Sequence, residues 1–291
     1  MKSIKYFFEF LIVIFFFIVF KFIGIRNSSN LSCYIFKKIG PIIRKKNKII
    51  KNIHIVFPNL NNAEIEKIIE SMWCNYGRIF SEYIHLNYFK KNKYDNIKIK
   101  DIEKLYKIKN LDKPILFFSG HFANFELLAM TLEKNNFNIC ALYRPLNNFF
   151  LNPIIKYLRI KYLCKDQIPK SIPGKGKGGT RLLLDRIKQK KNIALMVDQK
   201  VNEGIKVNLF KREALTINIP AQLALKHDYT LVPISIKREN SIDFVIDFKD
   251  PILITANENQ ESITKKVNSE LEKMIIDNPY QWIWTHDRWR I

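Results

Sequence analysis

The sequence predicts an α/β fold with a mainly parallel central sheet flanked by helices, preceded by a membrane-anchoring amino-terminal helix. Three observations support this. Short apolar runs alternate with helical stretches after residue 110, polar residues directly follow several of those runs, and residues 6–20 are apolar apart from Glu9. Regular alternation of strands and helices is typical of parallel sheets. We therefore divide the chain into an anchor (1–26), a basic, helical, membrane-proximal segment (27–110) and an α/β core (111–291).

The amino-terminal segment indicates an uncleaved anchor. Its apolar stretch resumes after Lys21, and roughly twenty apolar residues suffice to cross a bilayer. No small-residue cleavage site of the A-x-A type follows, which favours a single-pass anchor over a signal peptide or a surface-lying helix. Basic residues crowd the segment that comes next: Arg26, Lys37, Lys38, Arg44, Lys45, Lys46, Lys48 and Lys51. By the positive-inside rule, the main domain is expected to face the cytoplasm.

Charge and cysteine usage limit the classes of partner. The formal net charge is +22 over 291 residues, which favours an anionic partner such as a phosphorylated lipid, an acidic protein or nucleic acid. The four cysteines show no CxxC or Cys/His ligand spacing. They therefore support neither a disulfide framework nor a metal site, and reduced, cytosolic-side chemistry is the simpler expectation.

Further elements follow from apolar periodicity and capping residues. Asn61–Leu86 is expected to be a helix capped by Asn61 or Asn62, with Lys90–Lys109 as a charged connection to the core. In the core, strands are expected at Pro114–Phe118, Phe137–Leu142, Ile193–Val197, Leu231–Ile236 and Phe244–Phe248, and helices at Phe122–Leu132, Pro153–Leu163, Arg181–Lys188, Pro220–Lys226 and Ser262–Ile276.

The most informative motif is His121-Phe-Ala-Asn-Phe-Glu126, which follows the first core strand and its Ser119-Gly120 turn. Two helical residues five apart would not share a face, but a histidine in the turn and a glutamate in the first helical turns can converge. The carboxylate would then fix one imidazole tautomer and leave the other nitrogen as a general base. The alternative is a helix-end histidine or a surface pair, because so short a motif also occurs by chance.

Polar groups at the expected ends of other elements suggest a single site at the carboxyl edge of the sheet. They are Tyr143-Arg144-Pro145, Arg159, Asp198-Gln199 and Trp282-Ile283-Trp284-Thr285-His286-Asp287-Arg288. Each has a structural explanation when taken alone, such as a turn cap, a surface charge or a core side chain. Gly174–Gly179 lacks the pattern of a phosphate-binding loop, and we interpret it as a mobile basic loop.

In order and spacing, these groups resemble the late (lauroyl or myristoyl) acyltransferases of lipid A biosynthesis in Gram-negative bacteria, within the lysophospholipid acyltransferase-like superfamily. The resemblance covers about residues 41–291 and also includes Asn52, Phe57-Pro58, Asn75-Tyr76-Gly77-Arg78, Glu82, Phe210 and Ala214-Leu215-Thr216. The chain departs from the pattern at Ala123 and Phe125, where Gly and Trp are usual, at Asn152, where Asp is common, and after Phe210, where a small Gly is missing.

The resemblance implies a glycerol-phosphate-acyltransferase-like fold and an enzyme in the bacterial inner membrane. It would transfer a fatty acyl chain from the phosphopantetheine thioester of acyl carrier protein to a hydroxyl of a 3-hydroxyacyl group on a Kdo-bearing lipid A precursor. No bound cofactor, metal or nucleic acid is expected. His121 would be the base and Glu126 its orienting partner, while Arg159 or backbone N–H groups would stabilise the oxyanion. The substrate-binding residues would be Asn124, Arg144, Arg181, Asp198, Gln199, His286 and Arg288, with Lys175 and Lys177 available to phosphate.

Two alternatives remain open at this stage. The same chemistry would serve another membrane-lipid acceptor, because the motif that holds the hydroxyl and the thioester would be unchanged. A membrane-tethered basic protein that binds nucleic acid or anionic lipid is a non-enzymatic alternative. The basic residues are spread along the chain rather than forming a recognised nucleic-acid-binding pattern, which disfavours the latter.

Overall fold

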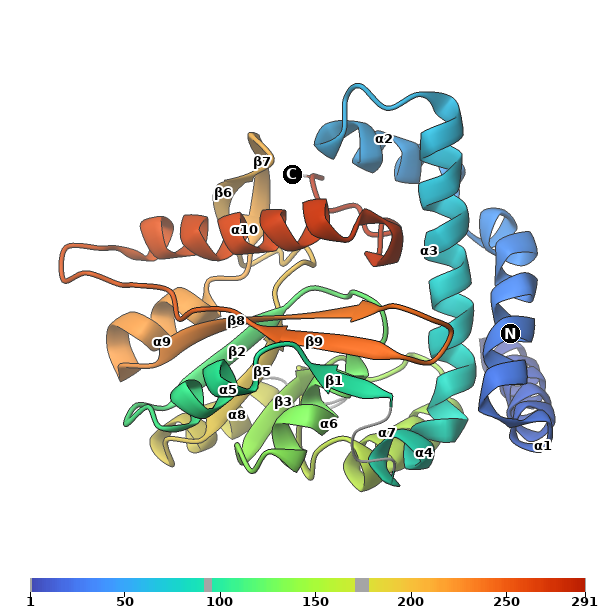
Figure 1. The fold of residues 1–291 in the computed structure, drawn as a ribbon, viewed down its shortest axis with the longest axis horizontal. Coiled ribbons are helices and arrows are strands. Elements are labelled where there is room, and N and C mark those ends of the chain that lie inside the picture. The colour runs from blue at the N-terminus through green and yellow to red at the C-terminus, as the bar shows by residue number, and fades with distance from the viewer. Residues whose placement is uncertain (1, 92–95, 171–177, 291) are drawn as a thin grey trace.

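A seven-stranded sheet forms the centre of the computed structural model, which describes residues 2–91, 96–170 and 178–290 (Figure 1). Its strand order is β1-β9-β8-β2-β5-β3-β4. The strands are β1 (Ile97–Ile99), β2 (Ile115–Ser119), β3 (Ile139–Tyr143), β4 (Asp166–Pro169), β5 (Asn192–Met196), β8 (Thr230–Arg238) and β9 (Phe244–Phe248). All neighbouring strands are parallel except β8 and β9, so the predicted mainly parallel α/β fold is confirmed.

Helices flank this sheet, and a separate antiparallel hairpin lies above it in Figure 1. The hairpin consists of β6 (Ile205–Leu209) and β7 (Arg212–Thr216). The helices of the core are α5 (Ile102–Lys109), α6 (Glu126–Lys134), α7 (Leu151–Tyr162), α8 (Gly178–Lys188), α9 (Ile219–His227) and α10 (Gln260–Asp277). A 3₁₀ turn, η2 (Pro279–Gln281), leads into the carboxyl-terminal segment.

Strands β2 and β5 occupy the middle of the sheet and fix the position of the site. All five residues of β2 are buried, as expected for a strand covered by helices on both faces. The two strands pair in parallel, with Ser119 opposite Met196. The residues that follow these two positions therefore emerge side by side at the carboxyl edge of the sheet.

The membrane-proximal segment is built from α1 (Lys2–Ile43), α2 (Lys46–Val56), α3 (Asn62–Glu82), η1 (Tyr83–His85) and α4 (Leu86–Lys91). The Asn61 side chain accepts the N–H of Glu64, and the Glu64 carboxylate accepts the N–H of Asn61, which closes a capping box at the predicted start of α3. The predicted 61–86 helix ends at Glu82, and the chain then continues through η1 into α4.

Helix α1 contains a break at Gly24, whose φ is 78°, and lies along α3 at the edge of the molecule (Figure 1). Among the described residues, α1 is the one helix long and apolar enough to cross a membrane. Its second part packs closely on α3, because a Cβ at Gly77 would lie 2.2 Å from the carbonyl oxygen of Ser32. Close approach of this kind requires glycine.

The expectation for the cysteines was wrong in one respect. Cys33 of α1 and Cys74 of α3 form a disulfide, with their Cα atoms 4.0 Å apart, whereas Cys140 and Cys164 are free and buried. The pair is 41 residues apart in the chain, so no motif spacing marks it. The packing of α1 on α3 brings the two residues together.

Candidate active site

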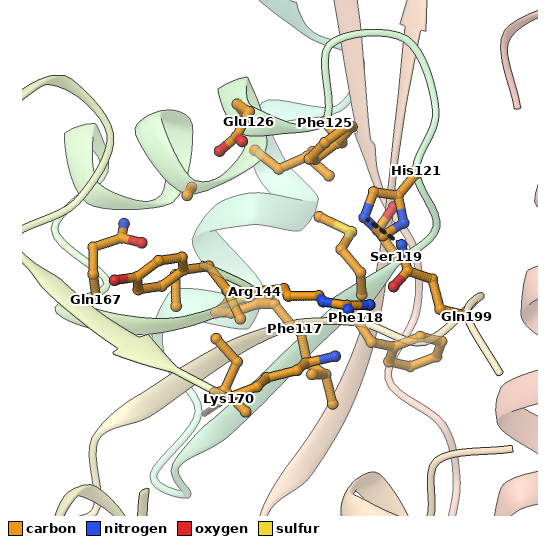
Figure 2. Close-up of a pocket in the computed structure, with 18 of the residues that line it drawn as sticks. Phe117, Phe118, Ser119, His121, Phe125, Glu126, Arg144, Gln167, Lys170 and Gln199 are labelled. Atoms are coloured by element: carbon orange, nitrogen blue, oxygen red, sulfur yellow. Dashed lines mark hydrogen bonds between the residues drawn. The ribbon is translucent and has the colours of Figure 1, made fainter. Parts of the chain in front are cut away.

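The candidate site lies where β2, β5 and β3 end, around a cavity of about 220 Å³ (Figure 2). Apolar side chains form the inner wall: Phe117, Phe118, Leu128, Ala129, Ala141, Leu142, Ala194, Leu195, Met196 and Ile234. Polar side chains also line the cavity: His121, Glu126, Tyr143, Arg144, Arg159, Gln167, Lys170, Gln199 and His286. An apolar cavity with a few convergent polar groups is the usual form of a small-molecule or lipid-chain site.

His121 is held by Asp198, not by Glu126 as expected. The Nδ1 atom of His121 lies 2.7 Å from Oδ1 of Asp198, and the backbone N–H of His121 donates to Oδ2 at 2.8 Å. The indole N–H of Trp282 donates to the same Oδ2 at 2.9 Å. A carboxylate at Nδ1 favours the tautomer in which Nδ1 carries the proton and Nε2 is free to accept one. His121 lines the cavity, whereas Asp198 is buried beneath it.

The protonation state of Asp198 suits this role. Burial alone would raise its pKa, but the positive charge of protonated His121 and the three hydrogen bonds from His121 and Trp282 hold the pKa well below its usual range. Asp198 therefore remains ionised throughout the physiological pH range. His286, which lines the cavity beside His121, has a lowered pKa, chiefly because burial disfavours its charge.

Glu126 forms a second polar cluster in the same cavity, with Arg159 and Tyr83. Both Nε, at 3.1 Å, and Nη2 of Arg159 donate to Oε1 of Glu126, and the Tyr83 hydroxyl donates to the same oxygen. Arg159 also lies over the ring of Tyr143, with its Cζ 5.4 Å from the ring centroid. Burial would lower the pKa of Arg159, but Glu126 and Tyr83 raise it, so the guanidinium stays charged.

The segment between His121 and Glu126 is a turn and not the first part of a helix. The prediction of a helix from Phe122 was wrong, because α6 begins at Glu126. Ala123 has φ 43°, and Phe122 pairs with Trp282 in an isolated antiparallel bridge. The N–H groups of Leu127 and Leu128 already donate to the carbonyls of Asn124 and Phe125, so these two do not face a free site.

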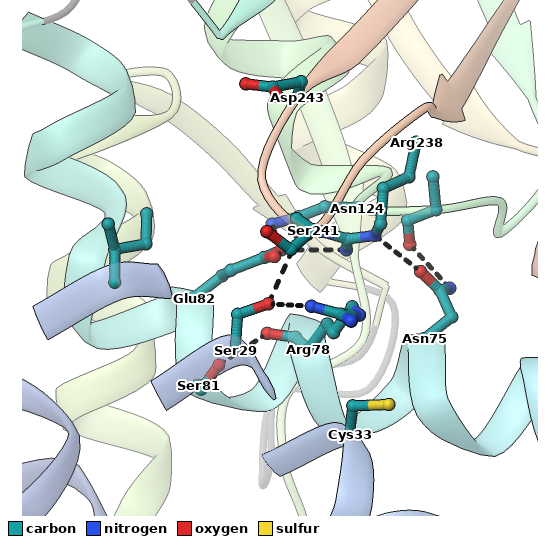
Figure 3. Close-up of polar contacts among 12 residues, drawn as sticks. Ser29, Cys33, Asn75, Arg78, Ser81, Glu82, Asn124, Arg238, Ser241 and Asp243 are labelled. Carbon is teal, nitrogen blue, oxygen red and sulfur yellow. Dashed lines mark hydrogen bonds and ion pairs between the residues drawn. The ribbon is translucent and has the colours of Figure 1, made fainter. Parts of the chain in front are cut away.

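A buried polar network holds the turn between His121 and Glu126 through Ala123 and Asn124 (Figure 3). Nδ2 of Asn124 donates to Oε2 of Glu82 at 2.8 Å, and Glu82 forms a fully buried ion pair with Arg238 at the end of β8. Nε of Arg238 donates to Oδ1 of Asn75, whose Nδ2 donates to the carbonyl of Ala123. Asn124, a predicted substrate contact, is buried, and its side chain points into this network and does not line the cavity.

Gly120 lets the chain pass close to both the Phe122 ring and the Asp198 carboxylate. A Cβ at this position would lie 2.7 Å from the Phe122 ring and 3.3 Å from Oδ2 of Asp198.

Gly120→Ala is therefore expected to displace the turn and weaken the His121–Asp198 contact. Turnover should fall by about tenfold or more, the scale expected for a displacement of about 1 Å. Turnover measured beside a thermal melt checks this, and a folded variant with normal turnover would show that the turn tolerates the shift.

Gln199 and His286 lie next to the free nitrogen of His121. Nε2 of Gln199 is 3.4 Å from Nε2 of His121 and 2.9 Å from Nε2 of His286. Arg144, directly after β3, and Lys170, directly after β4, also line the cavity. The pKa of Lys170 is lowered because burial disfavours its charge. The predicted residues Arg144, Gln199 and His286 are thus brought together with His121.

Two predicted substrate contacts lie elsewhere. Arg181 is an exposed residue of α8 and does not line the cavity. Arg288 is fully buried and donates to the Leu215 carbonyl at 2.9 Å and to Oγ1 of Thr216 at 2.7 Å. It therefore joins the carboxyl-terminal segment to the β6–β7 hairpin. The loop lysines Lys175 and Lys177 lie outside the described residues, as does most of the predicted glycine-rich loop.

Sequence reasoning also missed several residues of the site. Tyr83, Lys170 and Arg238 belong to it or support it, but each is far from the central motif in the chain. Among residues 2–91, 96–170 and 178–290, no group of three or more His, Cys, Asp or Glu side chains is placed to hold a metal ion.

The fold and the site define an α/β protein in which a buried carboxylate orients a histidine over an apolar cavity, beside an apolar helix suited to a membrane. Comparison with protein families identifies the group. The model of the bacterial lipid A biosynthesis acyltransferase family matches residues 1–291, the whole chain, and the protein belongs to that family. A search of curated proteins finds no match. The protein is therefore an acyltransferase of lipid A biosynthesis.

Proposed function

We propose that this protein transfers a fatty acyl chain from acyl carrier protein to a hydroxyl of a 3-hydroxyacyl group on a Kdo-bearing lipid A precursor. The observation that carries the proposal is the placement of His121. Its Nδ1 is fixed by a buried, ionised Asp198, and its ring lines an apolar cavity in a member of a lipid A acyltransferase family.

In the proposed reaction, Nε2 of His121 removes the proton from the acceptor hydroxyl as the oxygen attacks the thioester carbonyl. The new C–O bond forms, the C–S bond breaks, and the proton on His121 passes to the departing thiolate. General-base assistance of this kind contributes about 10²–10⁴ to a rate. Asp198 keeps the ring in the correct tautomer and stabilises the imidazolium that forms.

The negative charge on the thioester oxygen needs a donor near His121. We propose the Gln199 amide for this role, because its Nε2 lies 3.4 Å from Nε2 of His121. Arg159 was the expected donor, but its Nε and Nη2 are committed to Glu126 and Tyr83. We infer instead that Arg159 holds the Glu126 carboxylate in place at the cavity wall.

The apolar inner wall suits the acyl chain, and the cationic residues suit the anionic groups of the acceptor. Arg144 and Lys170 line the same cavity as His121 and would bind phosphate or Kdo carboxylate in the proposed complex. The formal charge of +22 would speed encounter with acidic acyl carrier protein. No cofactor is needed, because the thioester is already activated.

The proposed location is the bacterial inner membrane, with α1 as the anchor and the catalytic domain on the cytoplasmic side. A disulfide such as Cys33–Cys74 is uncommon in a reducing cytoplasm. The side of the membrane on which the catalytic domain lies should therefore be tested directly. A reporter fused to the carboxyl terminus is expected to be active only as a cytoplasmic reporter. Activity of a periplasmic reporter at the same position would contradict the proposed orientation.

Mass spectrometry of lipid A tests the acceptor. A strain that lacks the protein is expected to accumulate lipid A short of one secondary acyl chain, and the wild-type gene is expected to restore it. The His121→Ala gene is the matched control and should not restore the chain. An unchanged acyl pattern in the deletion strain would contradict the lipid A acceptor and favour another membrane lipid.

Arg159→Lys is expected to cost about tenfold in turnover, although the charge is retained. One ammonium group cannot reproduce the two N–H bonds to Glu126 together with the bond to Tyr83, because only the guanidinium has that forked geometry. Steady-state rates for Arg159→Lys beside Lys156→Arg, a change at an exposed position on the same helix, check this. Normal turnover in Arg159→Lys would show that the charge alone suffices.

A further inference from the structure

The first part of α1 is attached lengthwise to the core. Phe17 and Phe20 pack against Phe80 of α3, with ring centroids 5.4 Å and 6.0 Å apart. Two to three turns earlier, Phe7 and Phe10 pack against Phe150 at 5.6 Å and 5.8 Å. The helix is therefore held at both ends, and does not project freely from the domain.

The loop that holds the amino-terminal end of α1 is residues 145–150, between β3 and α7. Nδ2 of Asn148 donates to the Tyr6 carbonyl at 2.8 Å and to Oε2 of Glu9 at 3.2 Å. The Tyr6 and Phe149 rings lie 5.9 Å apart. These contacts also give a partner to the one acidic residue of the apolar stretch, since the Glu9 carboxylate accepts from Asn148 and pairs with Lys5.

The opposite face of α1 is exposed and apolar. It consists of Ile4, Phe8, Leu11, Ile12, Phe15 and Ile18. This face has the composition that a bilayer interior accepts, whereas water would not favour so large a continuous patch. Because residues 6–10 contact the 145–150 loop directly, insertion of the exposed face of α1 would also bring this loop to the bilayer.

The loop and α7 present side chains suited to the bilayer surface. Phe149 is 53 % exposed, and Leu146 is also exposed. On α7, exposed Tyr157 and Ile160 alternate with exposed lysines. Aromatic residues and lysines at one level are typical of membrane–water interfaces, where the lysines meet anionic headgroups. In Figure 1, α7 lies at the same end of the molecule as α1.

We propose that residues 145–150 and the exposed face of α7 form a second membrane-contacting surface beside α1, which docks on an anionic bilayer. Arg144 lines the cavity and directly precedes this loop, so docking places the cavity mouth at the headgroup level. A lipid acceptor then reaches His121 from the bilayer while its other chains remain in hydrocarbon. The inference rests on the proposed lipid acceptor only for this last step, because docking can be measured without turnover.

An environment-sensitive fluorophore on an introduced cysteine tests the surface. The probe is placed at Phe149→Cys, and separately at Tyr157→Cys in case the first change disturbs the ring contacts. The full-length protein is reconstituted in phosphatidylethanolamine–phosphatidylglycerol vesicles that contain spin-labelled lipid. Phe8→Cys, on α1, is the membrane-inserted reference. Leu253→Cys, on the β9–α10 loop at the opposite end of the molecule in Figure 1, is the aqueous reference. The parent chain is the labelling blank, because its cysteines are disulfide-bonded or buried.

The probes at 149 and 157 are expected to shift to the blue and to lose at least half of their emission to the spin-labelled lipid, as the probe at 8 does. The probe at 253 is expected to remain unquenched. If the probes at 149 and 157 both behave like the probe at 253 while that at 8 is quenched, the second surface does not exist. Quenching at none of the positions would equally overturn the proposal. Neither outcome depends on acyl transfer, so the proposed function is tested separately.

Discussion

Replacing His121 with alanine is expected to lower turnover by about a hundredfold or more, the usual scale for loss of a general base. Asp198→Asn should lose a comparable amount, because an amide at Nδ1 no longer selects the tautomer with a free Nε2 and no longer stabilises the imidazolium. Since the two residues act as one unit, the double substitution should be little worse than either single one. Steady-state rates with loaded acyl carrier protein provide the measurement.

Matched controls separate chemistry from folding in this series. His227→Ala and Asp250→Asn change the same residue types at exposed positions outside the cavity, and both should leave turnover unchanged. Circular dichroism should show that His121→Ala remains folded. Strictly additive losses in the double variant would mean that Asp198 acts independently of His121.

Removing Glu82 is expected to be the most destabilising single change, by about 3–5 kcal/mol, because it leaves the Arg238 guanidinium buried without its carboxylate. Arg238→Ala should lower the free energy of unfolding by a similar amount, because it leaves the Glu82 carboxylate buried without its guanidinium partner. The apolar pair Glu82→Leu with Arg238→Met should recover part of that loss, since neither charge is then buried. Denaturant unfolding of the three variants checks the prediction.

An exposed ion pair in the same chain provides the comparison. Lys265 and Glu261, one turn apart on α10, are both more than half exposed, and breaking this pair should cost only about 0.5 kcal/mol. The Glu82 variants should also lose activity beyond their loss of stability, because Asn124 then loses the acceptor that holds the His121 turn. Full stability of Glu82→Ala would show that Arg238 finds another partner.

Much of the fold could be predicted because its signals are local. Apolar runs located β2, β3, β5, β8 and β9 to within a few residues, and the Asn61 capping signal placed the start of α3. Four strands were missed. β1 has three residues and lies in a charged connection, β4 has four, and the β6–β7 hairpin carries polar residues that conceal its alternation.

The site was less predictable, because its central contact depends on strand order. His121 and Asp198 are 77 residues apart, and they meet only because β2 and β5 are neighbours that end at the same level. Both were singled out as residues that follow strands, but nothing local to the motif shows that a carboxylate other than Glu126 reaches the imidazole. The left-handed Ala123 and the delayed start of α6 turn Glu126 toward Arg159 instead.

The role of the buried Arg288 was the hardest to predict. An arginine near a site is expected to bind an anionic substrate, yet Nη1 and Nη2 of Arg288 donate to Leu215 and Thr216 of a distant segment. Only the packing of the carboxyl-terminal segment against the β6–β7 hairpin distinguishes a structural arginine from one that binds substrate. Burial of this kind has no local sequence signal.

The central claim is that the His121–Asp198 pair drives acyl transfer onto a lipid A precursor, and a single assay tests it most directly. The purified full-length protein is incubated with the Kdo-bearing precursor and with acyl carrier protein loaded with defined acyl chains. The lipid product is then identified and quantified by mass spectrometry. We expect the wild-type protein to add one acyl chain and folded His121→Ala to add about a hundredfold less in the same time. Equal product from the folded His121→Ala protein would contradict the claim.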